Sequence, residues 1–156
     1  MTSQIAALRE NRWALLEQLK GLTPEQFNLI PEGSGNNIIW NLGHMIVVQQ
    51  GACYNRAGLP TSIPDDFRQR FKPGSKPAGI TNADEIVSIQ QAMITTLDQL
   101  AADYQNNRFG NYAPWVTRYG AELTSIDDAL KFLLYHEEWH SAVIMELKGR
   151  MVRSMS

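Results

Sequence analysis

Cysteine is nearly absent from this sequence: Cys53 is the only one in 156 residues. A lone cysteine forms no disulfide within the chain, which is typical of proteins from a reducing compartment. The sequence therefore predicts a cytoplasmic protein. A chain of this length buries roughly two thirds of its unfolded surface, so a packed core needs no covalent support.

Long apolar runs are also missing. The N-terminal segment MTSQIAALRENRW reaches charged residues before any apolar run, which argues against a signal peptide. The longest nearly uncharged stretch, 38–54, contains Asn41, His44, Gln49 and Gln50. It is too short and too polar for a membrane span, so we expect no membrane association.

Neither sign of charge predominates. The chain has 14 Lys and Arg against 16 Asp and Glu, for a net charge of −2. No basic stripe appears, which argues against a nucleic-acid partner. The apolar fraction of 44% and the charged fraction of 19% are those of a globular protein. No composition shift marks a boundary, so we expect one domain over residues 1–156.

Four segments have the three-to-four-residue apolar spacing of helices. They are 3–20, 36–56, 82–107 and 126–148. The second helix is expected to begin at Asn36 or Asn37. Thr81 or Asn82 is the expected cap of the third helix and Ser125 that of the fourth, and Gly149 follows the expected end of the last helix. The connection 60–80 is expected to be irregular with a short turn near 65–71, and no strand is expected anywhere. The fold predicted is all-α, a four-helix bundle with long connecting loops.

Two of the three histidines, His136 and His140, lie four residues apart within the apolar stripe of the last helix. This spacing places both imidazoles on one helix face, about 5–6 Å apart at Cβ. Two inward-facing imidazoles bring buried nitrogens that need partners. Their spacing suits binding of one metal ion, although a buried histidine pair without metal is the alternative.

His44 supplies a possible third ligand from the middle of the second helix. It follows Gly43, which lowers helix propensity by about 1 kcal/mol relative to Ala. A small residue at this place is explained if another backbone or a ligand approaches closely. Three ligands would leave coordination positions open for water or substrate, as in catalytic zinc sites. The alternative is a buried histidine bonded to a carbonyl group.

The sequence His136-Glu137-Glu138-Trp139-His140 also matches the H-E-x-x-H motif of zinc proteases, in which the glutamate is the general base. The surrounding sequence lacks the Gly and His of the longer motif and leaves little chain for another ligand. Glu137 is a weak candidate for a catalytic base. Its simpler roles are a surface charge or a hydrogen-bond partner of a metal-binding histidine.

Other residues carry weaker signals. Cys53 lies on the opposite side of its helix from His44 and is expected to be a small buried residue. Trp13, Trp115 and Tyr119 are candidates to line a pocket. Trp139 is the tryptophan expected nearest the metal, because it lies between the two histidines of the last helix.

At these residues the chain resembles the DinB-like superfamily of helical-bundle metalloenzymes. The motifs are Trp40-Asn41-Leu42-Gly43-His44, then Tyr119-Gly120, Leu123-Thr124, Asp128-Ala129, His136-Glu137 and His140, and the ending Leu147-Lys148-Gly149. Each motif is short, and their order and separation over nearly the whole chain give the resemblance its specificity.

The resemblance implies an up-down-down-up four-helix bundle that binds zinc or nickel through His44, His136 and His140. It also implies a small-molecule substrate and a homodimer. The apolar residues on more than one face of the helix expected over 36–56 also favour a dimer. Characterised relatives include S-transferases that use the low-molecular-weight thiols bacillithiol or mycothiol, and a maleylpyruvate isomerase. Three functions therefore stay open. They are a metal-dependent transferase or hydrolase, a non-catalytic metal-binding stress or interaction protein, and a metalloprotease.

Overall fold

The computed structural model describes residues 2–155 and is predominantly helical. The long helices are α1 (Ser3–Gln18), α3 (Ile38–Cys53), α5 (Ala83–Gln105) and α6 (Ile126–Met155). The short ones are α2 (Pro24–Asn28), the 3₁₀ helix η1 (Asn55–Ala57) and α4 (Asp65–Phe71). A hairpin of β1 (Trp115–Val116) and β2 (Glu122–Leu123) completes the fold.

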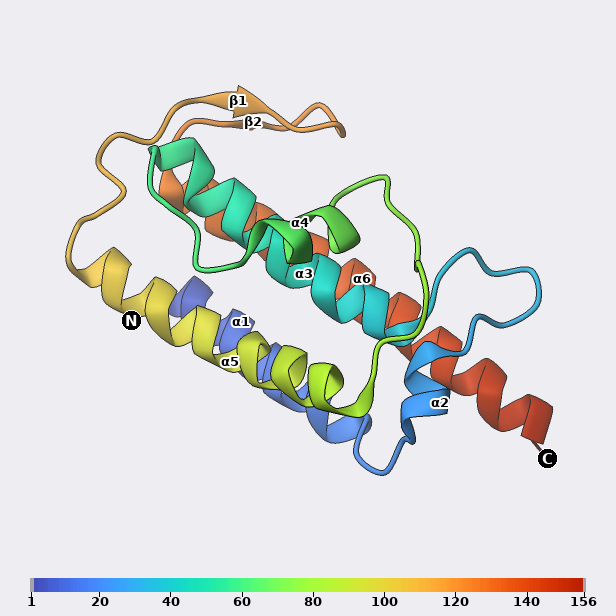
Figure 1. The fold of residues 1–156 in the computed structure, drawn as a ribbon. Helices are drawn as coiled ribbons and strands as arrows, with labels where there is room; N and C mark the ends of the chain where they lie inside the picture. Colours follow the sequence, from blue (N-terminus) through green and yellow to red (C-terminus); the bar gives the residue numbers. More distant parts are fainter. Residues whose placement is uncertain (1, 156) are drawn as a thin grey trace.

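The four long helices form a bundle in which α1 and α3 each pack against both α5 and α6. Figure 1 shows that α1 and α6 run in one direction and that α3 and α5 run in the other. This is the up-down-down-up arrangement, and the prediction of an all-α bundle is confirmed. Because α3 and α6 are antiparallel neighbours, residues in the middle of α3 face the middle of α6.

Side-chain caps fix where these helices begin, as the sequence predicts. The Asn37 side chain accepts a hydrogen bond from the Trp40 N–H at 2.9 Å, and Asn82 does the same for Glu85. Ser125 Oγ accepts from the Asp128 N–H at 3.2 Å. Each bond satisfies an N–H that has no partner within the first turn.

The predicted end of the last helix is wrong. The helix continues through Gly149 to Met155. A glycine inside a helix costs about 1 kcal/mol. Met151, one half-turn further on, is only 2% exposed and belongs to the main core. Burial of a side chain of this size contributes about 1.5–3 kcal/mol, which outweighs the glycine penalty.

Helix α3 is surrounded by the rest of the chain. Every one of its residues is buried except Val48 and Gly51, which are partly buried. The apolar residues on several faces of this helix are therefore satisfied within one chain. They give no reason to expect a dimer, so the homodimer stays a prediction from family resemblance.

The long connections lie against α3 and α6. Helix α4 packs on α3, which confirms the turn expected near 65–71. The expectation of no strand is wrong, since Trp115 pairs with Leu123 in an antiparallel hairpin. The hairpin turn contains Gly120 at φ 85°, where glycine is favoured, and β2 contacts α6. Within the described residues, no helix combines the length and apolar character needed to cross a membrane.

Candidate metal centre and adjoining cavities

The three histidines meet where α3 crosses α6. His44 comes from α3, and His136 and His140 come from α6. One possible ligand atom from each side chain lies within 4.8 Å of those from the other two. The ring centroids of His136 and His140 are 4.4 Å apart, and that of His44 is 5.3 and 4.6 Å from them. The triad inferred from spacing is therefore a real spatial cluster.

Gly43 allows α4 to approach and orient His44. A Cβ at Gly43 would lie 2.5 Å from the ring of Phe71, far inside van der Waals contact. The close approach comes from a side chain, and not from a backbone or ligand as the sequence suggested. With the ring seated there, the Phe71 carbonyl lies 2.9 Å from His44 Nδ1. Trp40 stacks on the same imidazole at 4.6 Å with an interplanar angle of 13°.

Asn41 orients His140 in a similar way. Its Oδ1 lies 2.8 Å from His140 Nδ1. The Asn41 amide is held in this orientation because its Nδ2 donates to the Asn37 carbonyl at 2.8 Å and to Asn36 Oδ1 at 3.1 Å. An asparagine inside an apolar helix thus has a defined task, which is to fix the ring of a candidate ligand.

These two contacts determine which ring nitrogens are available to a metal. A carbonyl oxygen only accepts hydrogen bonds, so the Nδ1 atoms of His44 and His140 must each carry the proton. In neutral imidazole the other nitrogen, Nε2, then has an unprotonated lone pair. His44 and His140 are thereby prepared as ligands through Nε2.

His136 provides the test of whether a metal fits. Its Nδ1 is buried and has no hydrogen-bond partner among the described residues. An unpaired buried polar atom costs about 1–3 kcal/mol, so such atoms are uncommon without a ligand or ion. Three neutral imidazoles form a donor set that suits zinc, nickel and similar ions. The residues present therefore fit one divalent metal ion.

The electrostatic environment keeps all three rings neutral. Burial is the main cause that lowers the pKa of His136 to about 3. The positive charge that His140 and His44 carry when protonated lowers this pKa further. Burial and the charge of His44 lower the pKa of His140 to about 3. Burial also lowers the pKa of His44, against the opposing effect of its bond to Phe71. Neutral imidazole is the form that binds metal.

The structure corrects both interpretations of Glu137. It is neither a surface charge nor a partner of a histidine, because it is only 2% exposed and bonds Arg12. Its Oε1 accepts from Arg12 Nε at 2.8 Å and its Oε2 accepts from Arg12 Nη2 at 2.5 Å. Arg12 Nη1 also donates to the Met93 carbonyl at 2.8 Å. A carboxylate held in this way is not placed as a protease base. The glutamate of the H-E-x-x-H match is explained instead by its buried ion pair with Arg12.

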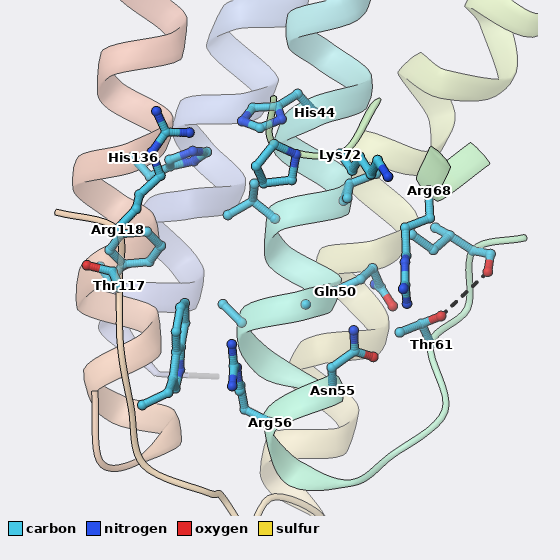
Figure 2. A pocket seen from close by; sticks show the side chains of 18 of the residues that line it. His44, Gln50, Asn55, Arg56, Thr61, Arg68, Lys72, Thr117, Arg118 and His136 are labelled. Carbon is cyan, nitrogen blue, oxygen red and sulfur yellow. Dashed lines mark hydrogen bonds between the residues drawn. The ribbon is translucent and has the colours of Figure 1, made fainter. Parts of the chain in front are cut away.

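A first cavity of about 510 Å³ opens beside the triad and is lined by His44 and His136 (Figure 2). It also contains Trp115, one of the aromatic residues expected in a pocket. Four basic side chains line it as well, contributed by Arg56, Arg68, Lys72 and Arg118.

A second cavity of about 590 Å³ lies between the hairpin and α6. Aromatic side chains line much of it, namely Tyr119, Phe132, Tyr135 and Trp139. The two cavities share four residues, which are Thr117, Tyr119, Phe132 and His136. Both cavities therefore reach the same candidate metal ligand, His136.

The structure agrees with some of the predictions for the remaining aromatic residues and Cys53, and not with others. The ring of Trp139 contacts that of His140 edge-on, with centroids 4.9 Å apart, but the side chain is 63% exposed. The ring of Trp40 lies equally near the triad, 4.6 Å from that of His44. Trp13 is 54% exposed and lines neither cavity. Cys53 is buried as expected, and burial raises the pKa of its thiol well above the ordinary range. That thiol is neither accessible nor ionised.

Sequence reasoning missed Asn41 and the basic residues of the first cavity. A signal for Asn41 was present, because it lies one helical turn before His44 in an otherwise apolar segment, where a polar side chain requires a partner. No comparable signal marked the basic residues. They come from η1, α4 and the hairpin, which only the folded chain brings together.

Comparison with known proteins agrees with the resemblance in the motifs. A search of curated proteins found no match to this chain. A family model described as the DinB superfamily matches residues 7–144, a span that includes all three histidines. The helical bundle and the clustered histidines are consistent with that match. The chain belongs to the DinB superfamily.

Proposed function

We propose that this protein is a metal-dependent transferase that joins a low-molecular-weight thiol to a second, more apolar substrate. The observation that carries the proposal is the pair of cavities that meet at His136. A transferase must bring two substrates to one reactive centre, whereas a hydrolase needs one substrate and water. The two cavities provide separate space for each substrate.

The ligand set favours an enzyme over a non-catalytic metal protein. Among the described residues, the cluster around the triad contains no fourth His, Cys, Asp or Glu. Structural zinc sites usually have four protein ligands, and catalytic sites have three. We propose zinc or nickel as the ion held by His44, His136 and His140. When bound, it would lower the pKa of a coordinated thiol or water and so supply a nucleophile near neutral pH.

The chain's own groups have the tasks of binding and positioning. Asn41 and the Phe71 carbonyl hold two histidines in the ligand tautomer. The aromatic second cavity would bind an apolar electrophile. Because Cys53 is buried, the thiol must come from solution. In the transfer, a carbon–sulfur bond forms, the bond from carbon to the leaving group breaks, and the thiol proton goes to solvent.

The test is thiol transfer by zinc- or nickel-loaded protein. We would follow the reaction of bacillithiol or mycothiol with a chlorodinitrobenzene, in which chloride leaves. The rate should exceed that of the same mixture with metal-free protein, and His136→Gln should reduce it to the metal-free level. Cys53→Ala is the matched control and should keep the wild-type rate. Equal rates with metal-loaded and metal-free protein would contradict the proposal.

A further inference from the structure

We propose that the first cavity binds a substrate through a carboxylate or phosphate group, held by Arg56, Arg68, Lys72 and Arg118. The inference rests on the proposed function in that it assigns the anionic substrate to this cavity and leaves the second cavity to the apolar one. Binding of the anion itself requires neither catalysis nor the apolar substrate.

The four cations converge from different parts of the chain. Arg56 belongs to η1, Arg68 to α4, Lys72 directly follows α4, and Arg118 lies in the hairpin turn. Figure 2 shows them around the same cavity, with Arg118 alongside His136 and Lys72 near His44. Arg56 and Arg68 lie farther along the cavity, near Asn55. If Arg56 and Arg68 hold the anionic group of a substrate, that group lies away from the candidate metal site. The other end of the same substrate can then reach the metal.

No acidic side chain balances this charge. Among the described residues that line the cavity, none is Asp or Glu. The ion pairs of the described chain use other cations, namely Arg9, Arg12, Lys20, Arg70 and Arg108. The chain as a whole has a net charge of −2. An acid-free group of four cations in an acidic protein concentrates positive potential in one concave region, which attracts anions.

Aromatic rings orient two of the guanidinium groups. Arg56 lies over the ring of Trp115 at 4.1 Å, and Arg118 lies over the ring of Tyr119 at 5.3 Å. Stacking restrains the guanidinium plane and leaves its N–H edge available. That edge matches the two oxygens of a carboxylate or phosphate in a bidentate contact. The neighbouring Asn55 adds an amide donor to the same region.

The second cavity has a different charge. Its lining includes Glu122 and Asp128 alongside Lys131, and most of its other large side chains are aromatic. An anion entering it would meet two carboxylates. The contrast between the cavities assigns the anionic substrate to the first one.

The same cations imply a coupling between anion and metal. Arg118 and Lys72 line one cavity with His44 and His136, and positive charge there opposes binding of a divalent cation. An anion in the cavity offsets that charge. Anion and metal should therefore raise each other's affinity, by a factor of about 5 or more if the coupling is of typical size.

The experiment is calorimetric titration of succinate and of inorganic phosphate into metal-free protein, and of succinate into zinc-loaded protein, without any thiol. Both anions should bind to the wild-type protein with saturation, and succinate should bind more tightly when zinc is present. The double variant Arg56→Gln/Arg68→Gln should lose at least about tenfold in affinity, as expected for loss of charge-assisted hydrogen bonds. The relative affinities of the two probes distinguish a carboxylate site from a phosphate site.

Arg9→Gln is the matched control, because it removes an exposed arginine outside the cavity and should keep wild-type binding. Succinamide, which is neutral, should not bind. Thermal melting checks that the double variant is folded. Absence of saturation by both anions, equal binding of succinamide, or unchanged affinity in a folded double variant would overturn the inference. Arginine-dependent binding without thiol transfer would instead reject the proposed function and leave the anion site standing.

Discussion

Replacing Glu137 with glutamine is expected to lower the free energy of unfolding by about 3–5 kcal/mol, because it leaves the guanidinium of Arg12 buried and uncompensated. Arg12 is fully buried, and Glu137 is 2% exposed. The change keeps the shape of the side chain, so the loss reports on charge and hydrogen bonding. Urea denaturation of the metal-free variant and wild type measures it. The variant should still bind metal, since the carboxylate of Glu137 is hydrogen-bonded to Arg12 and not to a histidine.

A second ion pair from the same helix provides the control. Arg9 and Asp98 lie 2.8 Å apart, but their side chains are 40% and 51% exposed. Asp98→Asn should therefore cost no more than about 1 kcal/mol. The double variant Arg12→Met/Glu137→Leu, which removes both charges, should be closer to wild type than Glu137→Gln. Equal stability of Glu137→Gln and Asp98→Asn would show that the buried pair is not held as described.

The stability of the metal-free protein should fall steeply as pH drops below about 6.5, the ordinary pKa of histidine. The folded-state pKa values of the three histidines are lowered, to about 3 for His136 and His140. Below about 6.5 the unfolded chain therefore binds protons that the folded chain does not, and this favours unfolding. Each fully titrating histidine contributes about 1.4 kcal/mol per pH unit. His136 and His140 together give a slope of about 2.7 kcal/mol per unit, and the lowered pKa of His44 adds to it in the same direction.

Urea denaturation at several values between about pH 7.5 and about pH 5 measures this slope. The triple variant His44→Gln/His136→Gln/His140→Gln contains no histidine at all, because the chain has only three. Most of the slope should disappear in it. Adding zinc should stabilise the wild type across the whole range, since the lowered pKa values leave protons weak competitors for the folded site. A wild-type slope equal to that of the triple variant would refute the buried, neutral state of the three rings.

Much of the fold was predictable because local signals and the global arrangement agree. Asn37, Asn82 and Ser125 cap the helices that the apolar spacing predicts. The triad was predictable for a related reason, since His136 and His140 share a helix face at short range. His44 came from a different helix, and its assignment depended on Gly43 and on the family resemblance.

The errors occurred where tertiary contacts overrule local preference. Burial of Met151 carries α6 past Gly149. The pairing of Trp115 with Leu123 creates strands too short to be recognised from periodicity. Glu137 was misread because its partner, Arg12, is on a different helix, 125 residues away in the sequence. The basic lining of the first cavity was invisible for the same reason.

The central claim is that His44, His136 and His140 together bind one divalent metal ion, and metal content tests it most directly. Protein purified without an affinity tag should contain close to one equivalent of zinc or nickel per chain. His44→Ala, His136→Ala and His140→Ala should each lose most of it, because each removes one ligand of three. The Cys53→Ala control should keep its metal. Wild-type metal content in any of the folded histidine variants would remove that residue from the site, and retention in all three would contradict the claim.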